Sequence, residues 1–261
     1  MMLKIEILEN DAVIRTYTSD KPKDFVSWPG GPSPEIILPN KRGHNRVHWD
    51  FRRASIPAVD KVFVYGSYAG SRVAPGNFKI RLSYGEVQKE TQITLLPNPN
   101  IEATTADFDA QQKLLIKIDS ALSNIHSSVN LMRNVQSQLQ FYIKTLKGNQ
   151  TYAQLIEKAE AIDKQLIDWE TNLIQPNQKT FQDVINFNNK LNAEWMYLKG
   201  FVDSEYPKVT QGAKDRFKDL LAKWKIHQNK LTVLIEDEFS AFEILFKSME
   251  VPALLIPELI D

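Results

Sequence analysis

The sequence LLIKIDSALSNIHSSVNLMRNVQSQLQFYIKTL, residues 114–146, decides the fold class of the C-terminal part of the chain. Its apolar residues recur at every third or fourth position, as they do on one face of a helix. A helix from Thr105 to Lys147 would be about 64 Å long at about 1.5 Å per residue, which is longer than an isolated globular core needs. We therefore expect it to pack along partner helices. The apolar stripe consists of Leu115, Ile118, Leu122, Ile125, Val129, Met132, Leu139, Ile143 and Leu146, and Val135 or Gln136 fills the gap.

Three further amphipathic segments follow, and a proline comes after each of them. Gly148 suits the position after a helix, Thr151 with Gln154 matches a capping box, and Thr180 is expected to cap the third helix. The short breaks predict antiparallel neighbours, and hence an up-down four-helix bundle over residues 105–261. The segments are 155–173 before Pro176, 184–202 before Pro207, and 217–249 before Pro252.

The first hundred residues have a different composition. They hold 7 of the 10 glycines and 9 of the 13 prolines, which favour short strands and turns over helices. We predict six or seven short strands in about 95 residues. This number is typical of an immunoglobulin-like β-sandwich, which we place at residues 1–98. Two prolines in Pro97-Asn98-Pro99-Asn100 interrupt strand and helix alike, so residues 99–104 are expected to be a linker. The predicted strands are 3–7, 13–17, 47–51, 62–65, 78–84 and 87–95.

Charge and cysteine content argue against several classes of protein. The chain has 32 Lys and Arg against 32 Asp and Glu, and a nucleic-acid-binding protein needs a basic surface to neutralise phosphates. The absence of cysteine excludes disulfides, thiolate metal sites and cysteine nucleophiles. The sequence has no apolar run of about 18 residues and no basic region followed by an apolar stretch at its start, so neither a membrane span nor a signal peptide is expected.

Titratable residues form no pattern that is typical of a catalytic or metal site. His44 and His48 would lie about 13 Å apart on a strand, too far to share one ion, while His126 and His227 are single polar positions on predicted helices. The sequence contains no GxSxG, no phosphate-binding glycine loop and no HExxH. We expect no metal, no cofactor and no catalytic residues. The carboxylates that could supply a glycosidase pair are Glu35, Asp50, Asp60 and Glu86, and no spacing among them favours any two.

Three aromatic residues are the candidate ligand-binding side chains. Trp28, Tyr65 and Tyr68 fall in or near predicted loops of the sandwich, where exposed rings can stack on the apolar faces of sugars. The alternative is that Trp28 folds over the open end of the sandwich core or against the helices. The sequence therefore leaves a glycan as one candidate partner.

Three stretches, in this order, resemble one family. Gly43–Arg52 is similar to a GxNRxxWDxR motif, residues 73–82 resemble an APGxYxVRL strand entry, and Thr105–Gln111 opens the long helix. The ordered set resembles the C-terminal region of bacterial sortilin-like propeller proteins, which are often labelled BNR-repeat glycosyl hydrolases. The resemblance implies an Ig-like module and a helical tail after a propeller. The chain contains no repeated propeller blades, so no residue of a propeller site has a counterpart in it.

The resemblance carries structural roles onto particular residues. It implies that Trp49 fills the sandwich core and that Asn45 closes a turn with Gly43. Arg46 and Asp50 are expected to serve neighbouring strands or the helical bundle rather than each other. Pro75 and Gly76 would start the strand that carries Phe78.

The resemblance also implies a function. It predicts a non-catalytic accessory or interaction module of a periplasmic, cell-surface or secreted protein, with a partner that is the parent propeller domain or a second copy bound through the helices. Two alternatives stay open: a carbohydrate-binding module that uses the aromatic residues, and a hydrolase with an unrecognised site.

Overall fold

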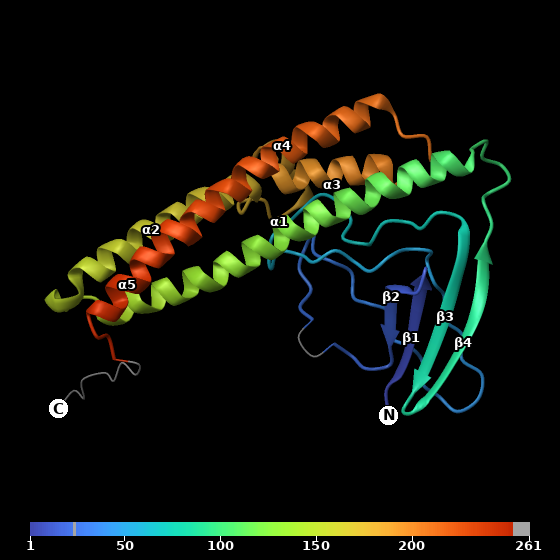
Figure 1. Ribbon diagram of the computed structural model, residues 1–261, viewed down its shortest axis with the longest axis horizontal. Coiled ribbons are helices and arrows are strands. Elements are labelled where there is room, and N and C mark those ends of the chain that lie inside the picture. Colours follow the sequence, from blue (N-terminus) through green and yellow to red (C-terminus); the bar gives the residue numbers. More distant parts are fainter. Residues whose placement is uncertain (23–24, 253–261) are drawn as a thin grey trace.

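The computed structural model describes residues 1–22 and 25–252, and within them the chain forms a β-sheet followed by helices (Figure 1). The predicted β-then-α order is confirmed. The strands are β1 (Leu3–Glu9), β2 (Ala12–Thr18), β3 (Gly76–Tyr84) and β4 (Val87–Leu95). The helices are α1 (Thr105–Leu146), α2 (Ala153–Leu173), α3 (Leu191–Val202), α4 (Gln211–Val233) and α5 (Ser240–Ser248).

The strands form one antiparallel sheet in the order β2-β1-β3-β4. The turn between β1 and β2 places Asn10 and Asp11 at positive φ, which these two residue types tolerate better than most. Gly85 has φ +57° and turns β3 into β4. The ladder between β1 and β2 shifts register between Ile7 and Leu8, as a β-bulge does.

The long segment between β2 and β3 covers one face of the sheet without forming regular strands of its own. The predicted strands 47–51 and 62–65 are wrong, because these residues have no ladder partner. Two isolated bridges, Thr18 with Ile37 and Arg52 with Arg72, are the only pairings in the described part of this segment. Six prolines between residues 22 and 57 remove donors that a strand would need.

The two faces of the sheet differ in character. One face is apolar and packs under the covering segment, where Trp49 meets Phe78 edge-on with ring centroids 5.2 Å apart. The other face carries alternating charges that pair across the strands, as in the 2.8 Å contact between Arg81 and Glu90. The buried residues of this core, of which Leu38 and Val73 come from the covering segment, are Ile7, Ile14, Tyr17, Leu38, Val73 and Phe78.

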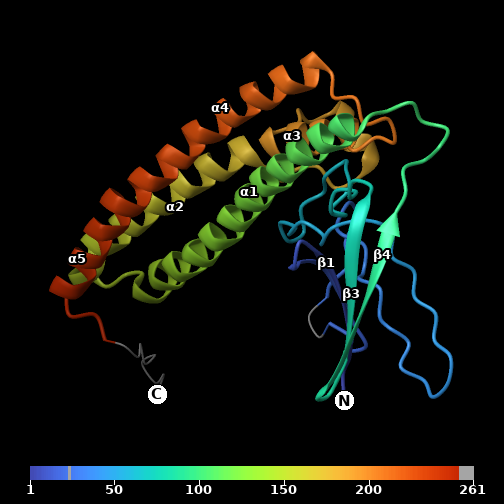
Figure 2. The ribbon, with the colours of Figure 1, turned by 45° about the vertical axis from the view of Figure 1, so that its right-hand side comes forward.

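The helices form an elongated body, and α1 runs along its length (Figure 1). Helix α3 lies beside the N-terminal half of α1, above the sheet, and α2 and α5 lie beside its C-terminal half. The turned view shows α4, α2 and α1 running side by side (Figure 2). The predicted helix 105–147 is confirmed almost to the residue, and among the described residues no helix is long and apolar enough to cross a membrane. The core of the body includes Ile118, Leu122, Ile125, Leu166, Leu173, Trp195, Leu220 and Trp224.

The predicted third helix is wrong over its first half. A short 3-10 helix, Phe181–Ile185, is capped by Thr180 and Asp183, and an irregular stretch separates it from α3. The amides of the buried side chains Gln175 and Gln178 donate to backbone carbonyls of this stretch, at Asn188 and Phe187. These hydrogen bonds give the two backbone carbonyls the partners that a helix would otherwise supply.

Two local predictions in the helical part also need correction. The capping box predicted at Thr151 is not formed; Asn149 accepts from the N–H of Thr151 instead and opens a 3-10 turn, Gln150–Tyr152, before α2. The predicted fourth helix is interrupted by a π-helical segment, Leu234–Phe239, which joins α4 to α5 without a break in the chain direction.

Candidate functional site

One side of α1 carries a row of polar side chains that bind the backbone of the covering segment. Their positions are separated by steps of 7, 7, 4 and 3 residues, which places them on one helix face. This row supplies the hydrogen bonds that a neighbouring strand would otherwise provide. The contacts are Gln112 with Ala74 N–H (2.7 Å), Asp119 with Ser71 N–H (3.0 Å), His126 Nδ1 with Pro57 O (2.7 Å), Asn130 with Ala58 O (2.8 Å) and Arg133 with Asp60 O (2.9 Å).

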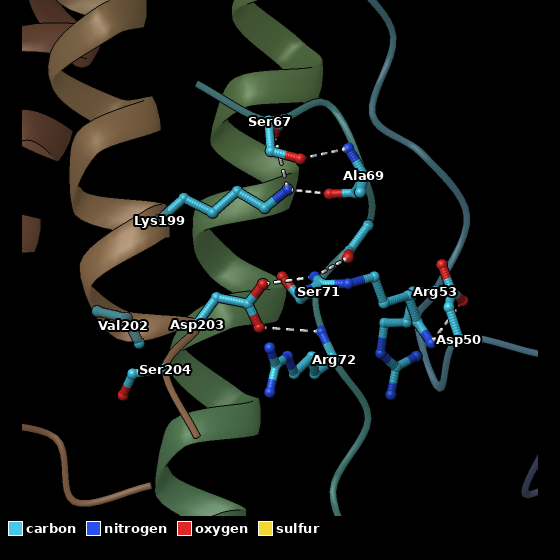
Figure 3. A network of polar contacts seen from close by, with 12 residues as sticks. Asp50, Arg53, Ser67, Ala69, Ser71, Arg72, Lys199, Val202, Asp203 and Ser204 are labelled. Atoms are coloured by element: carbon cyan, nitrogen blue, oxygen red, sulfur yellow. Dashed lines mark hydrogen bonds and ion pairs between the residues drawn. The ribbon is translucent and has the colours of Figure 1, made fainter. Parts of the chain in front are cut away.

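A buried lysine lies where α3 meets this row (Figure 3). The Lys199 ammonium donates to the carbonyls of Ala69 and, at 3.4 Å, of Ser67, and it lies 3.5 Å from the carboxylate of Asp119. Burial lowers the pKa of Lys199, and the nearby carboxylates of Asp119 and Asp203 oppose this shift. The ammonium therefore donates to the carbonyls of the Ser67–Ala69 loop, and the carboxylate of Asp119 faces its charge as an ion pair.

The residue that follows α3 binds the same segment from the other side. Asp203 Oδ2 accepts from Arg52 at 2.5 Å, and Oδ1 accepts from the backbone N–H of Arg72 at 3.1 Å (Figure 3). Arg52 also donates to the carbonyl of Gly70 at 2.8 Å. We call these contacts, the Lys199 contacts and the α1 row together the junction, defined as residues 52–74 with their partners on α1, α3 and Asp203.

A buried imidazole completes the middle of the junction. His126 is fully buried, and burial lowers its pKa to about 4, which its hydrogen bond to Pro57 O only partly opposes. Its Nε2 and the hydroxyl of Tyr68 have no hydrogen-bond partner among the described residues, and the two ring centroids lie 5.8 Å apart. His126 thus stays neutral at pH 7 and serves as a donor to the covering segment.

The three predicted ligand-binding aromatics do not gather into one site. Trp28 is half-buried and donates its indole N–H to Val62 O at 2.9 Å. Tyr65 is 63% exposed and stands edge-on to Phe181 at 5.5 Å. The prediction that Tyr68 is exposed is wrong, because the helices cover it; burial also raises the pKa of its hydroxyl. Trp28 and Tyr68 line different hollows, of about 290 and about 340 Å³.

The structural roles implied by the resemblance have mixed outcomes. The Asn45 amide donates to the carbonyls of Gly43 and Lys41, so the expected turn is formed. Trp49 packs against Phe78 as expected, and its indole N–H donates to Arg52 O at 2.9 Å.

The resemblance also implied roles for Gly76, Asp50 and Arg46. Gly76 follows Pro75 and is the first residue of β3, as expected. Asp50 does not serve a neighbouring strand or the helices, because its carboxylate accepts from the Arg52 N–H within the same loop, at 3.1 Å. Arg46 is exposed and makes no ion pair with a described residue.

Four carboxylates were candidates for a glycosidase pair. The structure brings two of them, Glu35 and Asp50, to the same hollow of about 340 Å³ that Tyr68 lines. Glu35 is engaged there: it accepts from the buried guanidinium of Arg15 at 2.6 Å and from the hydroxyl of Ser55 at 2.7 Å. Asp60 and Glu86 line other hollows. The described residues contain no group of three or more histidine, aspartate or glutamate side chains placed to hold a metal ion.

The residues that form the junction were largely missed by sequence reasoning. Lys199 and Asp119 sit at helical positions that look like ordinary polar faces, and their partners are backbone groups far away in the sequence. The heptad spacing of the α1 row was the available signal. Comparisons with known protein families, with curated proteins and with solved structures found no match to this chain.

Proposed function

We propose that the chain is a non-catalytic accessory module that holds a small β-rich unit rigidly against a helical rod and presents both to a partner protein. The observation that carries this proposal is the junction. Its charged groups are Lys199, which is buried, and Asp119 and Asp203, which are partly buried, and each is engaged with backbone or with an opposite charge. Groups committed in this way hold two parts of a fold together and have little capacity left for substrate.

The helical part supplies a candidate docking surface at the end distant from the sheet. Rings from α1 and α5 meet there: Tyr142 and Phe246 have centroids 5.0 Å apart, and Phe141 and Phe242 extend the set. Phe141 is 54% exposed, and Ile244, on the side of α5 that faces away from Phe242 and Phe246, is 70% exposed. We call the four rings and Ile244, which together surround the end of the rod, the rod-end patch. Exposed apolar clusters of this kind are characteristic of interaction sites.

The family and the finer fold are part of the same proposal. The ordered motifs 43–52, 73–82 and 105–111 support a relationship to the C-terminal region of sortilin-like propeller proteins. The turn at Asn45 and the contact of Trp49 with Phe78 are consistent with that resemblance. On this proposal the sheet with its covering segment is a divergent Ig-like sandwich, the helices are a four-helix bundle, and the partner is the parent propeller domain or a second copy.

Sedimentation velocity combined with the binding of an apolar fluorescent dye tests the proposal. The native chain is expected to bind the dye and to sediment in a concentration-dependent way, because the rod-end patch is exposed. The double substitution Phe141→Glu and Ile244→Glu should remove both effects, while Ile185→Glu, which changes an 84% exposed residue elsewhere, should remove neither. A compact monomer that binds no dye would contradict the proposal.

A further inference from the structure

The covering segment carries an exposed basic loop on the sheet part. Residues 36–49 contain no acid, and Lys41, Arg42 and Arg46 are all exposed. Within the described residues none of the three takes part in an ion pair. The loop is held in shape by Asn45, which accepts from the Lys41 N–H and donates to the Lys41 carbonyl. The cations are thus presented on a defined backbone.

An apolar groove of about 520 Å³ lies directly beside this loop. Its floor is the end of the sheet face that the covering segment leaves open, and Leu82 and Tyr84 remain 40% and 43% exposed there. Leu3, Ile5, Pro39 and Val47 complete the apolar lining. Asn40 and Asn45 of the basic loop form part of the wall, so the groove and the cations are parts of one surface.

We propose that this surface binds an acidic peptide segment that carries aliphatic anchor residues. The groove accepts one or two Leu or Ile side chains, and Lys41, Arg42 and Arg46 at its edge attract carboxylates on the same peptide. Apolar anchors in a pocket with charges at the rim are the usual division of roles in protein interfaces. The inference deepens the proposed function and rests on it, because it names the chemistry of a partner for such a module.

The apolar groove distinguishes a peptide from other anionic partners. A polyanion such as a sulfated glycan would use the three cations and leave Leu82 and Tyr84 without a partner. An anionic membrane would need a broad basic face, whereas this surface offers three cations beside an apolar groove. A peptide with both carboxylates and aliphatic side chains matches the whole surface.

Fluorescence anisotropy with the full chain and a labelled peptide tests this inference. A suitable probe is EVPALLIPELID, the sequence of residues 250–261, which has five Leu and Ile residues, three carboxylate side chains and no cation. We expect saturable binding that weakens as salt is added. Two control peptides, one with Gln in place of the acids and one with Ser in place of the aliphatic residues, should each bind at least about tenfold more weakly.

Variants of the protein separate the two parts of the surface. Arg42→Glu with Arg46→Glu should weaken peptide binding by at least about tenfold and remove its salt dependence, and Leu82→Ser should weaken it without changing the salt dependence. The matched control is Lys225→Glu, an exposed cation on α4 that forms no ion pair with a described residue, and it should bind like wild type.

Three results would overturn the inference. One is the absence of peptide binding, another is equal binding by wild type and Arg42→Glu/Arg46→Glu, and the third is binding of heparin or of phosphatidylserine vesicles in place of the peptide. The rod-end variants report on the proposed function separately: Phe141→Glu/Ile244→Glu leaves this groove untouched. If the peptide does not bind but the sedimentation experiment gives the expected result, the peptide-binding role of this surface is rejected and the proposed function stands.

Discussion

Lys199 on α3 and Asp119 on α1 both bind the loop at residues 67–71, and the Lys199 ammonium lies 3.5 Å from the Asp119 carboxylate. Asp119 accepts from the backbone and the hydroxyl of Ser71, while Lys199 donates to the carbonyl of Ala69. Two helices and the covering segment thus meet at one charge pair, in which Lys199 is buried and Asp119 is partly buried. Because a buried charge depends on its partners, each contact in this cluster stabilises the others.

Removal of one member of this pair should be strongly destabilising. Asp119→Asn leaves the Lys199 ammonium buried without its direct ion-pair partner and should lower the free energy of unfolding by about 3 kcal/mol. Lys199→Met should lower it by a similar amount. Urea denaturation followed by circular dichroism measures both effects. The double variant should lose less than the two single losses combined, because neither charge is then left alone.

An exposed ion pair provides the matched control. Lys218 is 73% exposed and lies 3.4 Å from Asp215 on the same helix, so Lys218→Met should change the free energy of unfolding by less than about 0.5 kcal/mol. Strictly additive losses at Asp119 and Lys199 would show that the pair does not act as a unit.

The buried imidazole of His126 predicts an acid-dependent loss of stability. Its folded pKa of about 4 lies below the ordinary value of 6.5, so the unfolded chain takes up a proton at higher pH than the folded chain does. The contribution of His126 to the free energy of unfolding is therefore constant above about pH 6.5 and falls as the pH drops from about 6.5 to about 4. At about 1.4 kcal/mol per pKa unit, the loss reaches about 3 kcal/mol.

Urea denaturation at a series of pH values isolates this effect. His126→Gln keeps a donor for Pro57 O but does not titrate, so its stability should vary less than that of wild type over this pH range. His44→Gln, at an exposed position, should follow wild type. Parallel curves for wild type and His126→Gln would contradict the assignment.

Tyr68 offers a test of the buried, unpartnered hydroxyl. Tyr68→Phe removes a polar group that makes no hydrogen bond with any described residue, so it should raise the free energy of unfolding by about 1 kcal/mol. Tyr68→Ala should lower it by about 3 kcal/mol, since the ring packs in the helical core. Thermal and urea denaturation measure both. A loss of stability in Tyr68→Phe would mean that the hydroxyl has a partner.

Trp28 and Tyr65 test the glycan alternative. Tyr65→Ala should change the free energy of unfolding by less than about 0.5 kcal/mol, because the ring is largely exposed. We expect a glycan array to show no specific binding by wild type, since Trp28 uses its indole N–H for Val62 O and is only partly accessible. Binding that is lost in Trp28→Ala would reinstate a carbohydrate-binding module.

Much of the helical part could be predicted from spacing alone. The stripe from Leu115 to Leu146 specifies α1, because a helix with one apolar face has few alternatives over that length. The sequence also predicts β3 and β4 well. Apolar and polar residues alternate with period 2 along β3, and a glycine turn at Gly85 then leads into β4. Local signals of this kind depend only on neighbouring residues.

The covering segment and the junction could not be predicted in the same way. Residues 62–65 form an apolar run like that of a strand, yet the backbone on either side of them, at Asp60 and Ser71, is bound by side chains of α1. Lys199 resembles a surface lysine in the sequence, and its burial depends on where the loop at Ala69 folds. These outcomes are decided by contacts between distant segments, which override local preference.

The distance between spin labels on the two parts of the molecule tests the central claim most directly. The chain contains no cysteine, so Val87→Cys on β4 and Ile244→Cys on α5, both at exposed positions, provide the only two thiols. Because the junction holds the sheet part against the rod, pulsed electron paramagnetic resonance should give a single narrow distance distribution, which broadens when Asp119→Asn and Lys199→Met are added. A broad or multiple distribution in the otherwise unaltered chain would contradict a rigid accessory module.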